Sequence, residues 1–405
     1  MTRLNRLPPL AVLIAACGGA HGAQLARAVT DTLPGGIVRV MSAGPTAWTD
    51  STGARLVEDG RFGGEDGTAG ELADPGSIAV DDAGRIYVAD KKPASIKVFT
   101  PDGKLVRVIG REGEGPGEFR AGFIAVRGAH LVLHDPQIGR TSVWDTSGTF
   151  LKSWHSSCCY WSDIQIDRQD RIYVPSAVPD PPGQAPRGTP YVRWTADGVA
   201  VDTLRVPQRQ GGKTWTITAG KGTKNMASMM TSVPFTPVMV WALHPDGGFV
   251  RAWTGGYAIV RSLTGQDTAR VFGRTWAPDP VTAEERKGAV DAKIKEVGGN
   301  FAADAMRAAF HAEDVPNSFP AFENLRVDQS GRVWARRYAV ADTTRTHYEV
   351  FDSTGGYLGP VTAPVNVFSW GRQAWTRDGF VAIIEDAEGR PTVVRFRLVA
   401  TDRSK

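Results

Sequence analysis

The chain has 405 residues, of which 41% are hydrophobic and 22% charged, and its 46 glycines and 26 prolines make up about 18% of it, against roughly 12% in average proteins. This composition excludes a disordered polyampholyte, a coiled coil and a protein with many membrane spans, and it indicates a folded chain rich in turns. The formal net charge is only +4, so no overall positive field favours nucleic acid as a partner.

Residues 1–16 have the pattern of a signal peptide. A short basic segment precedes the ten apolar residues 7–16, which are too few to cross a hydrocarbon layer of about 30 Å. The apolar stretch ends in IAAC, which resembles the lipobox of bacterial lipoproteins and implies a lipid on Cys17. An ordinary cleavage site beside an incidental cysteine is the alternative. The residue after the cysteine is Gly18 and not aspartate, and the resemblance therefore favours the outer membrane.

The lipid would anchor the rest of the chain to a membrane. We expect residues 17–34 to be a lipid-anchored tether and residues 35–405 to form one folded domain. Two or more acyl chains hold a protein stably, whereas one chain is marginal. The sequence therefore predicts a protein of the bacterial cell envelope, on its periplasmic or surface side.

An internal repeat dominates the folded domain. Two apolar stretches with alternating polarity flank a tight polar turn in SIAVDDAGRIYVAD (77–90), and a second hairpin follows in SIKVFTPDGKLVRVIG (95–110). Aspartate stabilises such turns and glycine accepts their positive φ. Related pairs of hairpins recur up to residue 400. The sequence therefore predicts an all-β fold of six four-stranded units, a six-bladed β-propeller.

The sixth unit lacks its last strand. Residues 47–64 supply a matching strand, and their turn sequence DSTG occurs again at 352–355 in the fifth unit. We expect this N-terminal strand to complete the last blade and close the ring, because closure removes exposed strand edges.

The run 62–119 resembles NHL repeats, and the whole chain is similar to bacterial six-bladed propeller lipoproteins. The resemblance is strongest in the first unit and weakest in the fourth and sixth. It implies the propeller fold, but the functions of such proteins vary, so it implies no particular activity.

The predicted meander places its long loops on one side. If the strands of a blade are labelled A to D from the axis outward, the A–B and C–D turns share one face and the B–C and D–A connections share the other. The latter, which we call the loop face, carries 111–122, 155–162, 175–190, 207–239 and 274–323. Long loops are often functional, so this face is the predicted binding face. Neutral variation of loop length is the alternative.

One of these loops contains helical patterns. Thr282 and Glu285 have the spacing of a capping box, and 301–313 forms a second helical segment with Asn300 as a candidate cap. We expect a helical hairpin over about 281–313, packed against the loop face as a lid over the central channel or as padding.

Two adjacent cysteines, Cys158 and Cys159, lie in another of the loops. Export exposes them to oxidising conditions, so a vicinal disulfide is one prediction. Neighbouring Cα atoms are only 3.8 Å apart, which would strain the bridge. Two small buried thiols are the alternative.

No motif in the sequence indicates catalysis. Residues 211–224 are rich in glycine and lysine, but Pro207 stands where a phosphate-binding loop needs its first glycine, so a flexible basic loop is predicted. Related propeller enzymes of the lactonase and lyase type hold Ca²⁺ or Zn²⁺ on the axis. The corresponding strand starts here offer Asp163 and Asn324, with Glu323 nearby. These oxygens are too few to be specific, so we expect no cofactor and keep a metal-dependent enzyme as the alternative.

Aromatic and arginine side chains suit a recognition surface, because they bury large areas and donate planar sets of hydrogen bonds. We therefore expect a binding or scaffold module for a protein, peptide or glycan. The predicted contact residues on the loop face are Arg120, Tyr160, Trp161, Trp253, Tyr257, Arg336, Arg337 and Tyr338.

Overall fold

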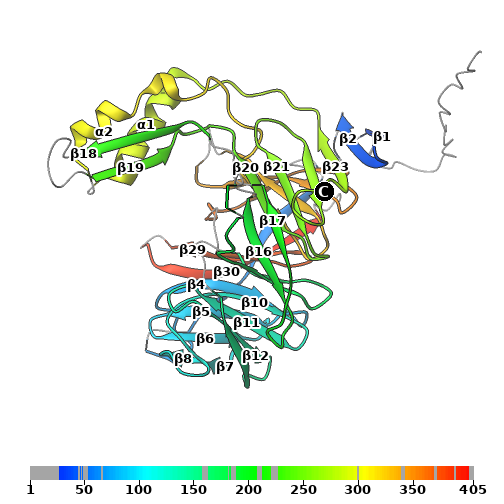
Figure 1. The fold of residues 1–405 in the computed structure, drawn as a ribbon, viewed down its shortest axis with the longest axis vertical. Helices are drawn as coiled ribbons and strands as arrows, with labels where there is room; N and C mark the ends of the chain where they lie inside the picture. Colours follow the sequence, from blue (N-terminus) through cyan, green and yellow to red (C-terminus); the bar gives the residue numbers. More distant parts are fainter. Residues whose placement is uncertain are drawn as a thin grey trace, which may run out of the picture.

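The computed structural model describes residues 27–43, 46, 48, 53–64, 67–156, 163–180, 182–183, 188–207, 212–219, 227–298, 301–338, 343–368, 372–386 and 389–400. These residues form a six-bladed β-propeller with four-stranded antiparallel blades, as predicted (Figure 1). Within the described residues, no helix is long and apolar enough to cross a membrane.

The first three blades follow one another along the chain. Blade 1 consists of β4 (Pro75–Val80), β5 (Ile86–Lys91), β6 (Ala94–Phe99) and β7 (Leu105–Ile109). Blade 2 consists of β10 (Phe123–Arg127), β11 (His130–Asp135), β12 (Arg140–Asp145) and β13 (Phe150–His155). Blade 3 consists of β14 (Gln165–Ile166), β15 (Ile172–Pro175), β16 (Thr189–Trp194) and β17 (Ala200–Val206). A short parallel pair, β8 (Arg111–Glu112) and β9 (Glu118–Phe119), lies between blades 1 and 2.

The remaining blades complete the ring. Blade 4 contains β20 (Met239–Leu243), β21 (Phe249–Trp253), β22 (Ile259–Ser262) and β23 (Arg270–Arg274). Blade 5 contains β24 (Asn324–Val327), β25 (Val333–Arg336), β26 (Thr346–Phe351) and β27 (Tyr357–Ala363). Blade 6 contains β28 (Gln373–Trp375), β29 (Gly379–Glu385), β30 (Pro391–Ala400) and, as its outer strand, β3 (Ala54–Phe62).

The ring closes as predicted. Strand β3 pairs antiparallel with β30, and Val57 stands opposite Arg397. Phe62 at the end of β3 then packs edge to face on Phe99 of blade 1, with ring centroids 6.5 Å apart. The start of the chain therefore fills the outer edge of the last blade and also joins the core between blades 6 and 1.

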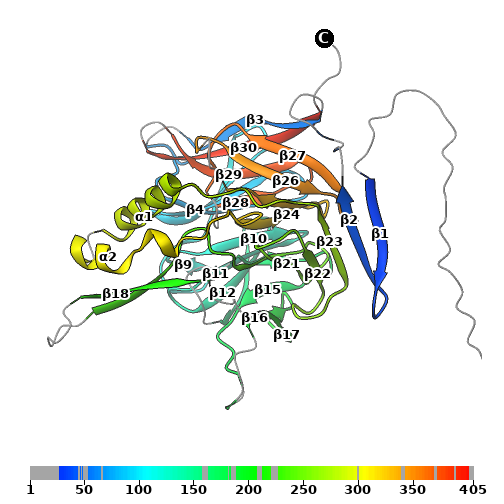
Figure 2. The ribbon, with the colours of Figure 1, turned by 90° about the horizontal axis from the view of Figure 1, so that it is seen from above.

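The stretch predicted to be a tether contains a strand. Strands β1 (Arg27–Leu33) and β2 (Ile37–Ala43) form a hairpin, and β2 extends blade 4 by pairing in parallel with β23 (Figure 2). Val40 and Ser42 of β2 are buried. The folded part therefore includes residues 27–33 and does not start at residue 35, because β1 pairs with β2 in a hairpin.

A hydrophobic cluster fills each of the six contacts between neighbouring blades. Trp144 and Trp334 are almost completely buried in two of these clusters, and Trp241 packs against a third. The blades are therefore held together by continuous apolar packing around the ring.

Two insertions on the loop face form a separate lobe. The hairpin of β18 (Thr214–Ala219) and β19 (Ala227–Ser232) precedes blade 4, and α1 (Ala283–Val297), α2 (Ala303–Ala309) and the short helix η1 (Ala312–Asp314) precede blade 5. Figures 1 and 2 both show these elements gathered on one side of the propeller, opposite β1 and β2. The loop face thus carries both insertions, as expected from the meander.

The lobe corrects one prediction and confirms another. Residues 214–219 form a strand where a flexible basic loop was expected, because the alternation in TWTITA buries Trp215 and Ile217. The helices, which begin at the predicted capping box of Thr282 and Glu285, pack on this hairpin. Helix α2 follows Ala302, and the candidate cap Asn300 lies outside the described residues.

Candidate functional site

A cavity opens on the loop face where blades 4 and 5 meet. Its volume is about 640 Å³, within the range of roughly 300–1,000 Å³ that is usual for small-ligand sites. Blade 4 contributes the end of β23, and blade 5 contributes residues at the end of β25 and the start of β26. The other walls come from the segments 275–280 and 319–321, which lead into and out of the helical insertion and which we call its roots. The lining residues are Arg274, Thr275, Trp276, Ala277, Asp279, Pro280, Phe319, Pro320, Ala321, Arg337, Tyr338 and His347.

A buried ion pair supports this cavity. The Glu349 side chain, only 2% exposed, accepts a hydrogen bond from Arg274 Nη2 at 3.1 Å and contacts the Tyr357 hydroxyl. The Arg274 guanidinium also lies 4.8 Å from the ring centroid of Tyr257 and 5.2 Å from that of Tyr357. A buried carboxylate is tolerated only when it is paired, so the positive charge of Arg274 is needed to balance Glu349.

Arg337 lines the same cavity but is much more open. Its side chain is 44% exposed, and its guanidinium nitrogens lie 3.6 Å from a Glu349 oxygen and 3.8 Å from an Asp279 oxygen. Both distances exceed the roughly 3.2 Å limit of a good N–H···O hydrogen bond. Arg337 therefore combines long-range attraction to two carboxylates with N–H groups that can still donate to a ligand.

Aromatic rings form the apolar part of the wall. Tyr338 packs on Phe319 with centroids 6.1 Å apart, and Phe235 contacts both rings at 5.7 and 4.7 Å. Trp276 meets Tyr257 edge to face at 6.2 Å. The cavity thus combines a cationic group with flat apolar surface, which is the composition of many ligand sites.

Of the predicted contact residues that the structure describes, Arg337 and Tyr338 line the cavity. Arg120 lies on the loop after blade 1, where its side chain forms an ion pair of 2.6 Å with Glu114. Trp253 at the end of β21 is 41% exposed and does not line the cavity. Both belong to the loop face but are separate from this site.

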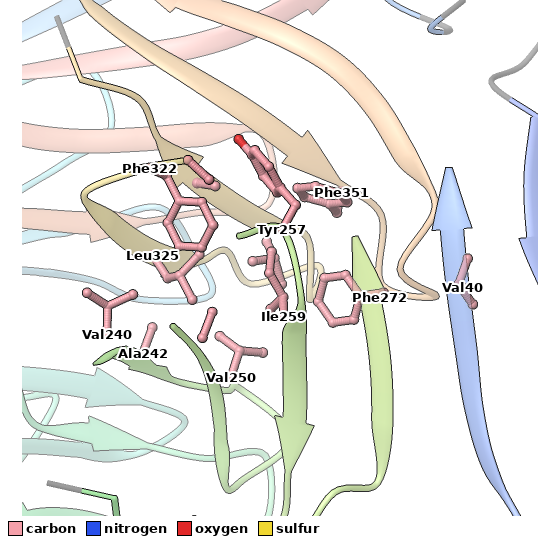
Figure 3. Close-up of a cluster of buried hydrophobic side chains, with 14 residues drawn as sticks. Val40, Val240, Ala242, Val250, Tyr257, Ile259, Phe272, Phe322, Leu325 and Phe351 are labelled. Carbon is pink, nitrogen blue, oxygen red and sulfur yellow. The ribbon is translucent and has the colours of Figure 1, made fainter. Parts of the chain in front are cut away.

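Two other predicted contact residues, Tyr257 and Arg336, are held by contacts within the protein instead. Tyr257 is 5% exposed and its ring lies between those of Phe322 and Phe351, at 5.1 and 6.0 Å (Figure 3). Burial raises the pKa of its hydroxyl well above the ordinary value. Arg336 is held by Glu323 and by the carbonyl of Val367. The sequence could not show this, because exposure depends on the neighbouring blade.

Several predicted residues fall outside the part of the chain that the structure describes. These are the lipidation candidate Cys17, the adjacent pair Cys158 and Cys159, and the aromatic residues Tyr160 and Trp161. Their predicted roles stay predictions.

Each of the three oxygen ligands considered for a metal has another partner in the protein. Glu323 is paired with Arg336, and burial raises the pKa of its carboxyl group. The Asn324 side chain accepts a hydrogen bond from its neighbour's backbone N–H at 2.8 Å, whereas Asp163 is half exposed and 3.9 Å from Arg326. Across the described ranges, no group of three or more His, Cys, Asp or Glu side chains could hold a metal ion.

Sequence reasoning missed much of the cavity. Trp276 and Asp279 lie on one root of the helical insertion, and Phe319 lies on the other, about forty residues later. The only local signal is the presence of aromatic and charged residues next to predicted helices. Their convergence depends on an antiparallel contact between the two roots, in which the Phe319 N–H donates to the Asp279 carbonyl at 2.9 Å.

Comparison with known proteins supports the fold. The model of the DUF5128 family, described as a 6-bladed beta-propeller, matches residues 70–122, which span blade 1 and the loop after it. No curated protein matches the chain significantly.

Solved structures with a similar course of the chain share little sequence. A DUF4221-family protein from Bacteroides vulgatus is 11% identical, with 87% of this chain and 100% of that one covered and a TM-score of 0.48. A putative exported protein from Bacteroides fragilis is 13% identical, with 87% and 98% covered and a TM-score of 0.47. Virginiamycin B lyase from Staphylococcus aureus, in a catalytically inactive form with quinupristin, is 11% identical, with 85% and 100% covered and a TM-score of 0.43.

Proposed function

We propose that this protein is an exported lipoprotein of the bacterial cell envelope whose propeller binds a ligand on its loop face. The signal-peptide pattern of residues 1–16 and the lipobox at Cys17 support the location. The single observation that carries the binding function is the cavity between blades 4 and 5, which joins an open arginine to aromatic walls.

The position of the cavity favours binding over a purely structural role. A scaffold needs only the apolar clusters between blades, whereas Arg337 and Tyr338 stand at the end of a blade, next to both insertions. Residues on loops that a rigid scaffold positions commonly carry recognition. The ligand is a peptide, a glycan or an exposed part of a protein that places one group in the cavity.

A ligand screen with matched variants tests this function. Peptides and glycans are screened by the rise in melting temperature that they cause, because a ligand that binds only the native state stabilises it. We expect the stabilisation by a ligand to disappear in Tyr338→Ala and Trp276→Ala, which remove two walls of the cavity. Trp253→Ala is the control, since Trp253 is an exposed aromatic residue of the same face outside the cavity.

The outcome separates the cavity from the rest of the face. If Trp253→Ala loses the response while both cavity variants keep it, the binding site lies elsewhere on the loop face. If all variants and the wild type respond to no peptide or glycan, the protein is not a binding module of this kind.

A further inference from the structure

We infer that the cavity between blades 4 and 5 takes a ligand with a carboxylate group next to an aromatic or apolar part. This inference rests on the proposed function and names the chemistry of its ligand. Among the described residues, the site combines the half-exposed cation of Arg337 with a group of flat rings, and each of the two features selects one part of the ligand.

Arg337 selects the anionic part. A guanidinium has five N–H donors in a planar fork that matches the two oxygens of a carboxylate. Its two acidic neighbours approach only to 3.6 and 3.8 Å, so they hold the side chain at the cavity without using up its donors. A ligand oxygen at ordinary hydrogen-bond distance would bind the fork more closely than either protein carboxylate does.

The balance of charge favours a single negative charge on the ligand. Arg274 is already neutralised by Glu349, which is buried beside it. Arg337 remains, opposed mainly by Asp279, whose side chain is 67% exposed and therefore well screened by water. A carboxylate would meet one available cation. A phosphate monoester carries nearly two charges, and its second charge would face Glu349 and Asp279 without a partner.

The aromatic walls select the second part. Trp276, Phe319 and Tyr338 line the cavity together with two prolines and two alanines. Such a surface gains from burying an apolar group, and rings add a further contribution when they stack or meet edge to face. A volume of about 640 Å³ admits a group of the size of an acylated aromatic amino acid.

Titration calorimetry and ligand-observed NMR with small probes test this inference at pH 7. N-acetylphenylalanine is the probe, because it carries one carboxylate beside a ring. N-acetylphenylalaninamide lacks the charge, N-acetylglycine lacks the ring, and phenyl phosphate carries the dianion. We expect N-acetylphenylalanine to bind at least about tenfold more tightly than each of the other three. A hydrogen-bonded charge pair is worth about that factor against the amide, and burial of the ring contributes a similar factor against N-acetylglycine. The second charge of phenyl phosphate would lack a partner.

Variants assign the effect to Arg337. Arg337→Gln keeps a similar length but removes the charge and the fork, and we expect it to abolish the advantage of the carboxylate over the amide. Arg120→Gln is the matched control, because Arg120 is another exposed arginine of the loop face, with a side chain 55% exposed. We expect this control to bind all four probes as the wild type does.

Three results would overturn the inference. They are equal binding of the acid and the amide, an unchanged preference in Arg337→Gln, and no binding of N-acetylphenylalanine at concentrations up to about 10 mM. A neutral ligand that the screen finds, and that Tyr338→Ala loses, would leave the binding function intact and reject only the carboxylate. Failure of both experiments would reject the function as well.

Discussion

A buried aspartate organises the A–B turn in three of the six blades. In blade 5, one oxygen of Asp328 accepts hydrogen bonds from the backbone N–H groups of Ser330 and Arg332, at 2.8 and 3.0 Å. The other oxygen accepts from Arg332 Nε at 2.6 Å and from the indole N–H of Trp334 at 3.0 Å. Asp81 and Asp167 make the same set of bonds in blades 1 and 3. The spacing of aspartate, arginine and aromatic residue therefore encodes both the turn and the packing behind it.

Blade 4 replaces this aspartate by a histidine. The Nδ1 atom of His244 accepts a hydrogen bond from the Asp246 N–H at 3.1 Å, so the ring is neutral in this arrangement. Burial, together with the nearby charges of Arg261 and Arg168 and against the opposing effect of Asp246, lowers the pKa of His244 from 6.5 to about 3. In blade 4 a neutral imidazole nitrogen thus accepts the turn hydrogen bond that an aspartate accepts in blades 1, 3 and 5. The blade has Gly248 at the position where those blades have the arginine that pairs with the aspartate.

The pKa of His244 predicts a loss of stability in acid. Between about pH 6.5 and pH 3 the unfolded chain binds a proton at this histidine and the native chain does not, so the free energy of unfolding falls as the pH falls. We expect about 1–2 kcal/mol of this loss between pH 6.5 and pH 5. His244→Asn keeps an acceptor but cannot titrate, and urea unfolding at several pH values should show a weaker pH dependence.

The exposed His155 supplies the control for this measurement. His155→Asn removes a histidine at the surface and is unfolded in urea over the same series of pH values. Identical pH dependence in His244→Asn and the wild type would mean that His244 does not carry the effect.

Among the secondary-structure elements, the lobe has a core of its own. The ring of Trp215 on β18 stacks on Phe310, with centroids 4.7 Å apart, and its indole N–H donates to Asp314 at 2.8 Å. The buried members of this cluster come from the two insertions, without any residue from the blade strands. The lobe is therefore a unit that sequence-distant insertions form together, and neither insertion could bury its apolar face alone.

Replacing Trp215 tests whether the lobe is independent. Trp215→Ala removes a ring that is 3% exposed, and such changes cost roughly 3–5 kcal/mol. We expect hydrogen exchange to rise in β18, α1 and α2 while the blade strands keep their protection. Met230→Ala on the exposed side of the same hairpin, where the side chain is 69% exposed, should change little. Equal loss of protection in the blades would show that lobe and propeller unfold as one unit.

On the scale of the whole molecule, the N-terminal segment connects three neighbouring blades. Strand β2 pairs with blade 4, the Trp48 N–H donates to the Leu358 carbonyl of blade 5 at 2.8 Å, and β3 completes blade 6. The chain therefore runs along the outer rim before it closes the ring. If Cys17 carries a lipid, the nine residues between it and β1 span at most about 32 Å, which would hold blade 4 close to the membrane.

Membrane attachment through Cys17 gives a prediction for the intact protein. Cys17→Ser should move the protein from the membrane fraction to the soluble fraction of the expressing cells, because lipidation needs the thiol. Cys158→Ser is the control, since it removes a cysteine away from the signal-peptide junction. Unchanged sedimentation of Cys17→Ser with the membranes would exclude this lipid as the anchor.

The sequence alone determined the number of blades, the turn positions and the closure of the ring. Each of these depends on signals within a few residues, such as Asp328 with Arg332 and Trp334, or on a repeated turn such as DSTG. Only the tertiary structure decided where the cavity lies. Arg274 and Glu349 come from different blades and Phe319 from an insertion root, and their meeting is set by how blades and lobe pack. Turn chemistry is local, whereas the exposure of a side chain and the convergence of several side chains depend on partners distant in the chain. For that reason Tyr257 is buried in the core and Arg337 lines the cavity, although the sequence made both equally plausible contact residues.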